Sequence, residues 1–178
     1  MRLAHLRQNR IVEIPNLNFD TWAQNGKNWY PNSDAANSFW ATGNEGVTLG
    51  GNSNSMGVED SRSGLSAQLQ TVQVKVLIVK VKAAGNLFIG SYKTNTSNPA
   101  SSVTFGRPYE GARPTKLSGY FKYQPGDTMS SGSVPADRTL TSDECDIYIQ
   151  LCQETKRLVK DTSLPMRQYL NILHLKSL

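Results

Sequence analysis

The arrangement of apolar residues limits the possible folds more than any other property of this sequence. In residues 70–82, valines alternate with glutamine and lysine, which is the period-2 pattern of a half-buried strand. The valines occupy even positions up to Val76 and odd positions from Val79 onward. Because side chains alternate strictly along a strand, this change of phase predicts a bulge or a sharp bend near Leu77–Ile78.

Other segments show strand-like patterns as well. Residues 86–92 follow a glycine and are expected to pair antiparallel with 70–82. Residues 115–123 and 144–151 alternate again, and the intervals between segments are rich in Asn, Ser, Gly and Thr, which favour turns. Short strands separated by turns, with no amphipathic helix among them, are typical of an all-β sandwich or barrel.

The composition changes after residue 151 and suggests three parts. Residues 1–10 are interpreted as a linker or the stub of a preceding domain, and 11–151 as the β domain. Residues 152–178 form a tail rich in Leu, Lys and Arg. A helix could begin in this tail near Ser163, because Pro165 suits a first helical turn. Alternatively, the tail is a truncated or frame-shifted end that never belonged to the domain.

The net charge of +5 invites a nucleic-acid-binding hypothesis, but the distribution of charge argues against it. Residues 11–151 contain 11 basic and 12 acidic side chains and are therefore close to neutral. The excess of positive charge lies in the two flanks, 1–10 and 152–178. A nucleic-acid site needs basic residues on the domain itself, so we expect no nucleic-acid partner.

Composition also argues against several other classes. The longest apolar run, around Val76–Val79, is far shorter than the roughly 20 residues of a membrane-spanning helix. The first residues lack the apolar stretch of a secretory signal. Two cysteines, Cys145 and Cys152, are too few for a disulfide framework or a multi-cysteine zinc site. We expect no cofactor, although Glu59–Asp60 or Asp143 could hold a structural calcium ion.

Aromatic and amide residues are concentrated in the N-terminal third. All three tryptophans lie within 19 positions, at Trp22, Trp29 and Trp40, and several asparagines stand among them. Sugars present apolar C–H faces and a rim of hydroxyls, so a sugar site needs flat aromatic surfaces together with amides and carboxylates. The same residue types also occur in hydrophobic cores and in turns, and that interpretation stays open.

A catalytic function has less support in the sequence. Glycoside hydrolysis needs two carboxyl groups roughly 5–10 Å apart across the scissile bond. Glu45 and Glu110 are the best candidates for such a pair, and both are weak ones. Serine chemistry lacks a suitably placed histidine, because both histidines lie near the chain ends.

Several segments in order resemble the PCMD family, a carbohydrate-metabolism domain of Bacteroidetes. The matching segments are N-L-N-F-D-T-W at 16–22, W-Y-P-N at 29–32, F-W-A-T-G-N-E-G at 39–46, A-A-G-N-L-F-I-G-S-Y at 83–92, F-G-R-P-Y at 105–109, A-R-P-T-K-L-S-G-Y-F-K-Y-Q-P-G at 112–126 and D-E-C-D-I-Y at 143–148. The resemblance implies a β-jelly-roll sandwich with a sugar cleft, in a periplasmic or cell-surface protein. Family members continue beyond the last of these segments as a jelly roll, so the resemblance also implies that this jelly roll is incomplete at its C-terminus.

Together these observations predict a carbohydrate-binding module that takes part in glycan recognition or utilisation, with an oligo- or polysaccharide as its partner. The residues expected to stack on sugars or to bond their hydroxyls are Trp29, Trp40, Tyr109, Asn32, Asn44, Glu45 and Arg113. One alternative is a glycoside hydrolase or lyase acting on polysaccharide. Another is a structural or adhesion module of the cell surface without a small ligand, in which the tryptophans would be buried.

Overall fold

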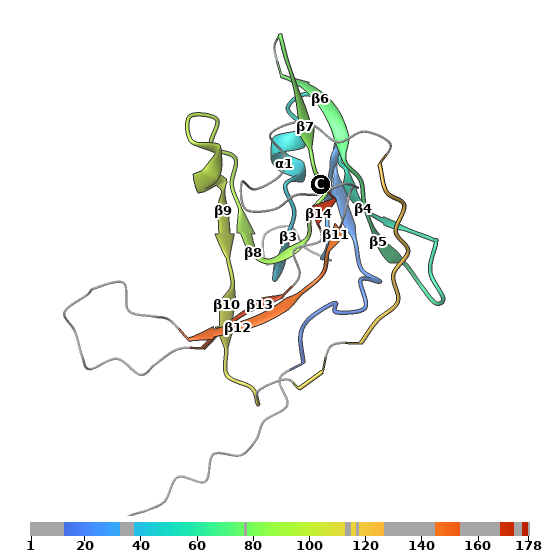
Figure 1. The fold of residues 1–178 in the computed structure, drawn as a ribbon, viewed down its shortest axis with the longest axis vertical. Helices are drawn as coiled ribbons and strands as arrows, with labels where there is room; N and C mark the ends of the chain where they lie inside the picture. The colour runs from blue at the N-terminus through green and yellow to red at the C-terminus, as the bar shows by residue number, and fades with distance from the viewer. Residues whose placement is uncertain are drawn as a thin grey trace, which may run out of the picture.

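The computed structural model describes residues 13–32, 38–76, 78–112, 115–116, 118–126, 145–153, 168–172 and 176–177. Within these ranges the chain is built mainly from short strands (Figure 1). Helical structure in the described part is limited to the single turn α1 (Asn44–Val47) and the 3-10 segment η1 (Pro99–Ser102). No described helix has the length and apolar character needed to cross a membrane.

Every described strand pair is antiparallel. The two-stranded sheets are β1 (Ala23–Asn25) with β2 (Asn28–Tyr30), β4 (Ser55–Val58) with β5 (Ser66–Leu69), β6 (Val72–Val76) with β7 (Val79–Ala83), and β11 (Cys145–Asp146) with β14 (Lys176–Ser177). The three-stranded sheets are β3 (Trp40–Ala41), β8 (Phe88–Tyr92) and β9 (Val103–Phe105), in the order β3-β8-β9, and β10 (Arg107–Tyr109), β13 (Gln168–Ile172) and β12 (Ile149–Gln153), in the order β10-β13-β12. The all-β class predicted from the sequence is therefore confirmed, and the jelly-roll arrangement stays a prediction.

The hydrophobic core forms where β3 and β8 meet. Its centre is made of Trp40, Leu87 and Ile89, which are all fully buried. Phe19 and Phe39 pack edge-on against the Trp40 ring, with centroid separations of 4.9 and 6.1 Å. These aromatic contacts and the burial of three large apolar side chains hold the segment before β1 against the β3-β8-β9 sheet.

The change of phase in residues 70–82 has a different origin from the predicted bulge. The chain reverses between Val76 and Val79, and β6 and β7 form an antiparallel hairpin in which Val74 stands opposite Val81. When a two-residue turn joins two antiparallel strands, each even-numbered residue stands opposite an odd-numbered one, and the two share a face of the sheet. The predicted sharp bend is thus a complete turn of the chain.

Other predicted strands also need correction. Residues 86–92 contain β8, which pairs with β3 and β9 instead of with 70–82. The described residues of 115–123 form no strand, because alternation alone does not supply a hydrogen-bonding neighbour. Residues 144–151 contain parts of two strands, β11 and β12, with Ile147 and Tyr148 between them.

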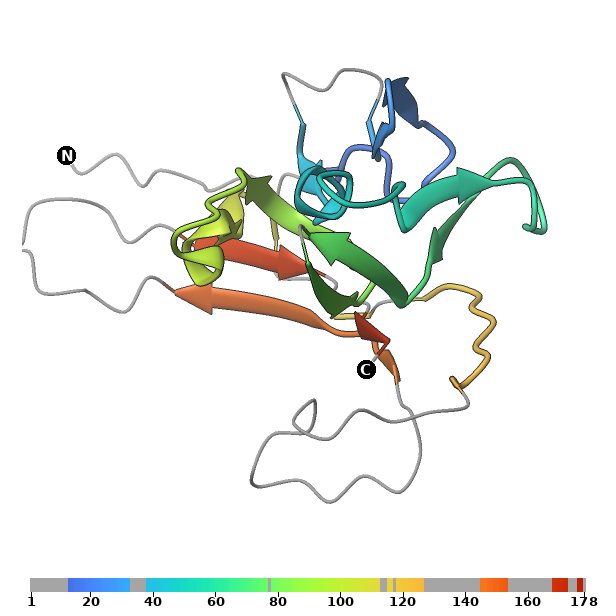
Figure 2. The same cartoon turned by 90° about the horizontal axis from the view of Figure 1, so that it is seen from above.

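The region after residue 151 also differs from expectation. β12 extends to Gln153, and residues 168–172, where a helix was one of two alternatives, form the strand β13. β13 pairs on both sides, with β10 and with β12, and it also lies against β8. Figure 2 shows this sheet on one side of the strands β8 and β9. The C-terminal strands therefore take part in the β structure.

Candidate functional site

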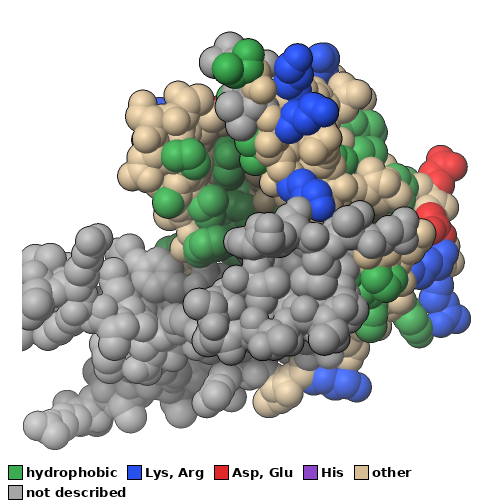
Figure 3. Space-filling model, turned by 45° about the horizontal axis from the view of Figure 1, so that its top comes forward, with side chains coloured by type: hydrophobic (Ala, Val, Ile, Leu, Met, Phe, Trp, Pro, Cys, Tyr) green, Lys and Arg blue, Asp and Glu red, His purple; other side chains and the backbone are tan. Residues whose placement is uncertain are grey.

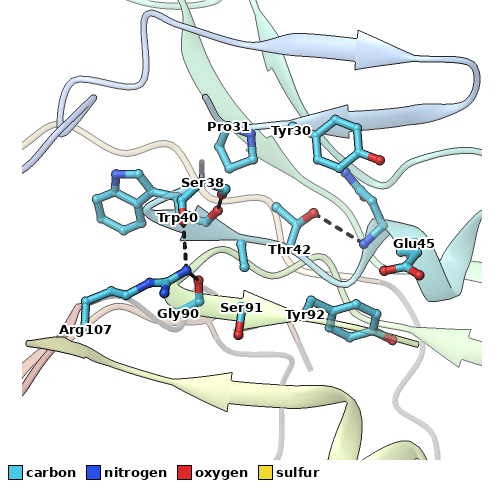
Figure 4. Close-up of a pocket in the computed structure, with 12 residues that line it drawn as sticks. Tyr30, Pro31, Ser38, Trp40, Thr42, Glu45, Gly90, Ser91, Tyr92 and Arg107 are labelled. Carbon is cyan, nitrogen blue, oxygen red and sulfur yellow. Dashed lines mark hydrogen bonds between the residues drawn. The ribbon is translucent and has the colours of Figure 1, made fainter. Parts of the chain in front are cut away.

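A small pocket opens between β2, the β3–α1 segment, β8 and β10. Its volume is about 160 Å³. The described residues that line it are Tyr30, Pro31, Ser38, Trp40, Ala41, Thr42, Asn44, Glu45, Gly90, Ser91, Tyr92 and Arg107 (Figure 4). Three residues predicted for the sugar site are among them: Trp40, Asn44 and Glu45.

The predicted stacking role of Trp40 needs correction. Its side chain is 0% exposed, and its indole N–H donates a 2.7 Å hydrogen bond to the Pro15 carbonyl. A sugar can stack only on a ring face that solvent can reach, and both faces of this ring are covered by protein. Trp40 instead supports the pocket from within the core.

The two predicted asparagines are engaged by the backbone around the pocket. The Asn44 amide donates to the carbonyls of Trp29 and Ser55, at 2.8 and 2.7 Å, and its oxygen accepts from the N–H groups of Asn54 and Ser55, each at 3.1 Å. The Asn32 amide donates to the Ser38 hydroxyl and the Trp40 carbonyl, at 2.6 and 3.2 Å. Because these groups are already paired, both residues hold loops together and are poorly placed to bond sugar hydroxyls.

The accessible side chains at the rim are aromatic and acidic. Tyr30 and Tyr92 are half-buried, and Glu45 is exposed at the start of α1. Figure 4 shows the Glu45 carboxylate between the two tyrosine rings on the helix side of the pocket. The Tyr92 hydroxyl end lies so close to Gly46 that a Cβ atom there would collide with it. The absence of a side chain at Gly46 therefore lets Tyr92 lie against the helix.

Arg107 closes the opposite side of the pocket. Its Nη2 donates two hydrogen bonds of 2.9 Å, to the carbonyls of Ser38 and Gly90, and so connects β10 to the β3 and β8 segments (Figure 4). Its Nε is buried and has no hydrogen-bond partner. Gly90 has a φ of +149°, and a Cβ there would collide with the Thr104 carbonyl of β9. Only glycine permits this close approach of the two strands beside the pocket.

The other predicted residues lie elsewhere. Trp29 is half-buried in β2 and is not among the pocket-lining residues. Tyr109 packs against the core, and its hydroxyl donates to the Ala112 carbonyl at 2.7 Å. Arg113 lies outside the described residues. Glu110 is exposed and does not line the pocket, so the structure does not bring it together with Glu45 there.

Nine of the twelve described lining residues were not predicted from the sequence, among them Tyr30, Tyr92 and Arg107. Tyr30 adjoins Trp29 in the W-Y-P-N segment, and neighbouring side chains on a strand point to opposite faces. Tyr92 and Arg107 belong to two of the segments that resemble the PCMD family, 83–92 and 105–109, but no residue pattern there marks these two side chains as ligand-binding. No local signal could have selected Tyr92, because its place beside the same pocket as Tyr30 depends on the order of the strands.

The sequence matches the family described as "Putative carbohydrate metabolism domain" (PCMD) over residues 18–175. The chain belongs to the PCMD family. The match extends beyond the boundary expected at residue 151 and includes β13. Comparisons with curated proteins and with solved structures gave no match.

The described residues contain no group of three or more His, Cys, Asp or Glu side chains that could hold a metal ion. Of the acids considered for calcium, Asp60 pairs with Lys122 on the surface, and Asp143 lies outside the described residues. A structural calcium ion stays a prediction. In the pocket itself, Glu45 is the carboxylate and Arg107 the guanidinium among the described lining residues.

Proposed function

We propose that this PCMD domain binds carbohydrate through the pocket at Tyr30, Tyr92 and Glu45, as part of glycan recognition or utilisation. The observation that carries the proposal is the placement of two accessible aromatic rings on either side of one carboxylate (Figure 4). Aromatic rings suit the C–H faces of a sugar, and a carboxylate accepts hydrogen bonds from its hydroxyls. The carbohydrate-metabolism role in the family description supports this choice of ligand.

The pocket favours one sugar unit of a longer chain. Its volume of about 160 Å³ is below the roughly 300–1,000 Å³ typical of sites that enclose a drug-sized ligand. A single ring would enter between Tyr30 and Tyr92, and neighbouring units would extend over the surface. Ser91 is exposed on the pocket wall and adds a hydroxyl that can both donate and accept.

Hydrogen bonds hold the two opposite walls of the pocket in place, one through Asn44 and the other through Arg107. Asn44 fixes the start of α1, and hence Glu45, to the strands on either side. Arg107 ties together the carbonyls of Ser38 and Gly90 on the opposite wall. A preformed site loses less conformational entropy on binding, which supports recognition by few contacts.

The test is calorimetry with a panel of neutral hexasaccharides of β-1,4-glucan, β-1,4-xylan and β-1,4-mannan. For the best ligand we expect Tyr92→Ala and Glu45→Gln each to weaken binding about tenfold, the effect of losing one ring contact or one charged hydrogen bond. The matched control is Tyr120→Ala, which removes an 82% exposed ring that does not line the pocket. Unchanged affinity in both pocket variants, or loss in the control, would refute the proposal.

A second candidate is a structural or adhesion module without a small ligand. The complete burial of Trp40 favours it, since that hypothesis predicted inward-facing tryptophans. The same panel separates the two functions, because a module of this kind binds none of the hexasaccharides.

We also propose that the protein works in the periplasm or at the cell surface of a gut-type Bacteroidetes bacterium, where polysaccharides are encountered. This proposal rests on the family resemblance. Fractionation of the source cells, followed by detection with an antibody, would test it, and a purely cytoplasmic signal would contradict it.

A further inference from the structure

The β6–β7 hairpin carries a group of basic side chains that the pocket does not use. Lys75 stands directly opposite Lys80, and Gln73 stands opposite Lys82 two register positions further along. Residues two apart on a strand, and residues directly opposite in a pair, share one face. We call this the lysine face, made of Lys75, Lys80, Lys82 and Gln73. No acidic residue occurs anywhere in residues 72–83.

The hairpin is anchored by its other face. Val74 is 5% exposed, and its side chain lies against Gly51. Gly50 lies directly against the Lys75 backbone, where a Cβ atom would collide with the Lys75 carbonyl. Val74 and the Lys75 backbone thereby hold β6 against the segment that follows α1, and all members of the lysine face are exposed to solvent.

Figure 1 shows the hairpin projecting from the end of the molecule next to α1. In Figure 3, Lys and Arg side chains gather over this end, and acidic side chains lie apart at one edge. Among the described acidic side chains, none pairs with Lys75 or Lys80, whereas Asp60 pairs with Lys122. Like charges directly opposite on a pair of strands repel each other, so this face attracts anions.

We propose that the lysine face binds an acidic polysaccharide, a chain that carries carboxylate or sulfate groups. Lys80 and Lys82 follow each other on one face of β7, and Lys75 stands opposite Lys80, so the charges are spread along the strand direction, which suits a linear polyanion better than a single small anion. The family's carbohydrate role favours a glycan as the polyanion. The near-neutral charge of residues 11–151 disfavours nucleic acid, which needs a longer basic surface.

The lysine face is separate from the pocket, since none of its residues lines the pocket. It therefore adds a second site to the proposed function. A chain bound there would be held by charge, and its binding would weaken at high salt, because the screening length falls from about 10 Å at 0.1 M to about 3 Å at 1 M.

The probe is polygalacturonate, with its fully methyl-esterified form as the neutral counterpart, measured by calorimetry in low and high salt. We expect the charged form alone to bind, and the variant K75Q/K80Q/K82Q to bind it about tenfold more weakly. The matched control is K27Q/K93Q/K116Q, which removes the same charge from exposed lysines elsewhere and is expected to change affinity by less than about twofold. Circular dichroism of both variants checks that they fold.

Three outcomes would overturn the proposal. One is equal loss in the control variant, which would mean that net charge alone drives binding. Another is binding of the esterified form as tight as that of the charged form. The third is that the protein binds a 20-mer DNA duplex or anionic vesicles tightly but does not bind polygalacturonate. Neutral hexasaccharides report on the pocket and polygalacturonate on the hairpin, so failure of one proposal is distinguishable from failure of the other.

Discussion

The Asn44 side-chain amide is predicted to contribute strongly to the stability of the domain. It is 2% exposed and takes part in four hydrogen bonds, two donated to the carbonyls of Trp29 and Ser55 and two accepted from the N–H groups of Asn54 and Ser55. At a net value of about 1 kcal/mol for each bond, Asn44→Ala should lower the free energy of unfolding by about 4 kcal/mol. That is a large fraction of the roughly 5–15 kcal/mol typical of a domain, and it corresponds to a fall in melting temperature of about 10 °C.

The assay is urea unfolding followed by tryptophan fluorescence, with a thermal melt on the same samples. Asn44→Asp keeps the size of the side chain but removes both donors and places a carboxylate against two carbonyls, so it should cost at least as much as Asn44→Ala. The control is Asn52→Ala, an exposed position expected to change stability by less than about 0.5 kcal/mol. A loss below about 1 kcal/mol for Asn44→Ala would refute the structural role given to this amide.

Three further changes test other parts of the structure. Trp40→Ala removes a fully buried indole and should cost about 3–5 kcal/mol in urea unfolding, whereas a ligand-facing ring would cost little. Gly90→Ala places a Cβ against the Thr104 carbonyl at a positive φ and should lower stability by about 1–3 kcal/mol, and a neutral effect in the thermal melt would contradict this. Lys80→Glu turns a repulsive pair with Lys75 into an attractive one and should raise stability by up to about 1 kcal/mol at low salt; an equal gain at 1 M salt would rule out an electrostatic cause.

The fold class could be predicted because the alternation of apolar and polar residues is a local property. The strand pairing could not, as residues 70–82 illustrate. Their change of phase is explained equally well by a bulge within one strand and by a reversal between two strands, and only the register of Val74 with Val81 decides between them. Residues 115–123 alternate in the same manner, yet their described part has no hydrogen-bonded partner strand.

Of the residues expected to bind sugar, Trp40, Asn44 and Glu45 line the pocket, and its use as a sugar site stays a prediction. β2 has three residues, which is too short for its pattern to show whether Trp29 or Tyr30 faces the pocket. Asn44 is of a residue type that often binds sugar hydroxyls, but its side chain bonds backbone groups instead, one of them the Ser55 carbonyl. The contributions of Tyr92 and Arg107 depend on β8 and β10 meeting near β3, which no local pattern reveals.

The proposed mode of binding places a sugar ring between Tyr30 and Tyr92. The most direct measurement is an NMR titration of the protein labelled with carbon-13 at its tyrosine rings, using the best-binding neutral hexasaccharide and assigning each ring with a Tyr→Phe variant. We expect saturable shifts of the ring signals of Tyr30 and Tyr92 and none for that of Tyr120. The proposed binding mode would be contradicted if only the Tyr120 signal shifted, or if calorimetry showed binding while the ring signals of Tyr30 and Tyr92 did not change.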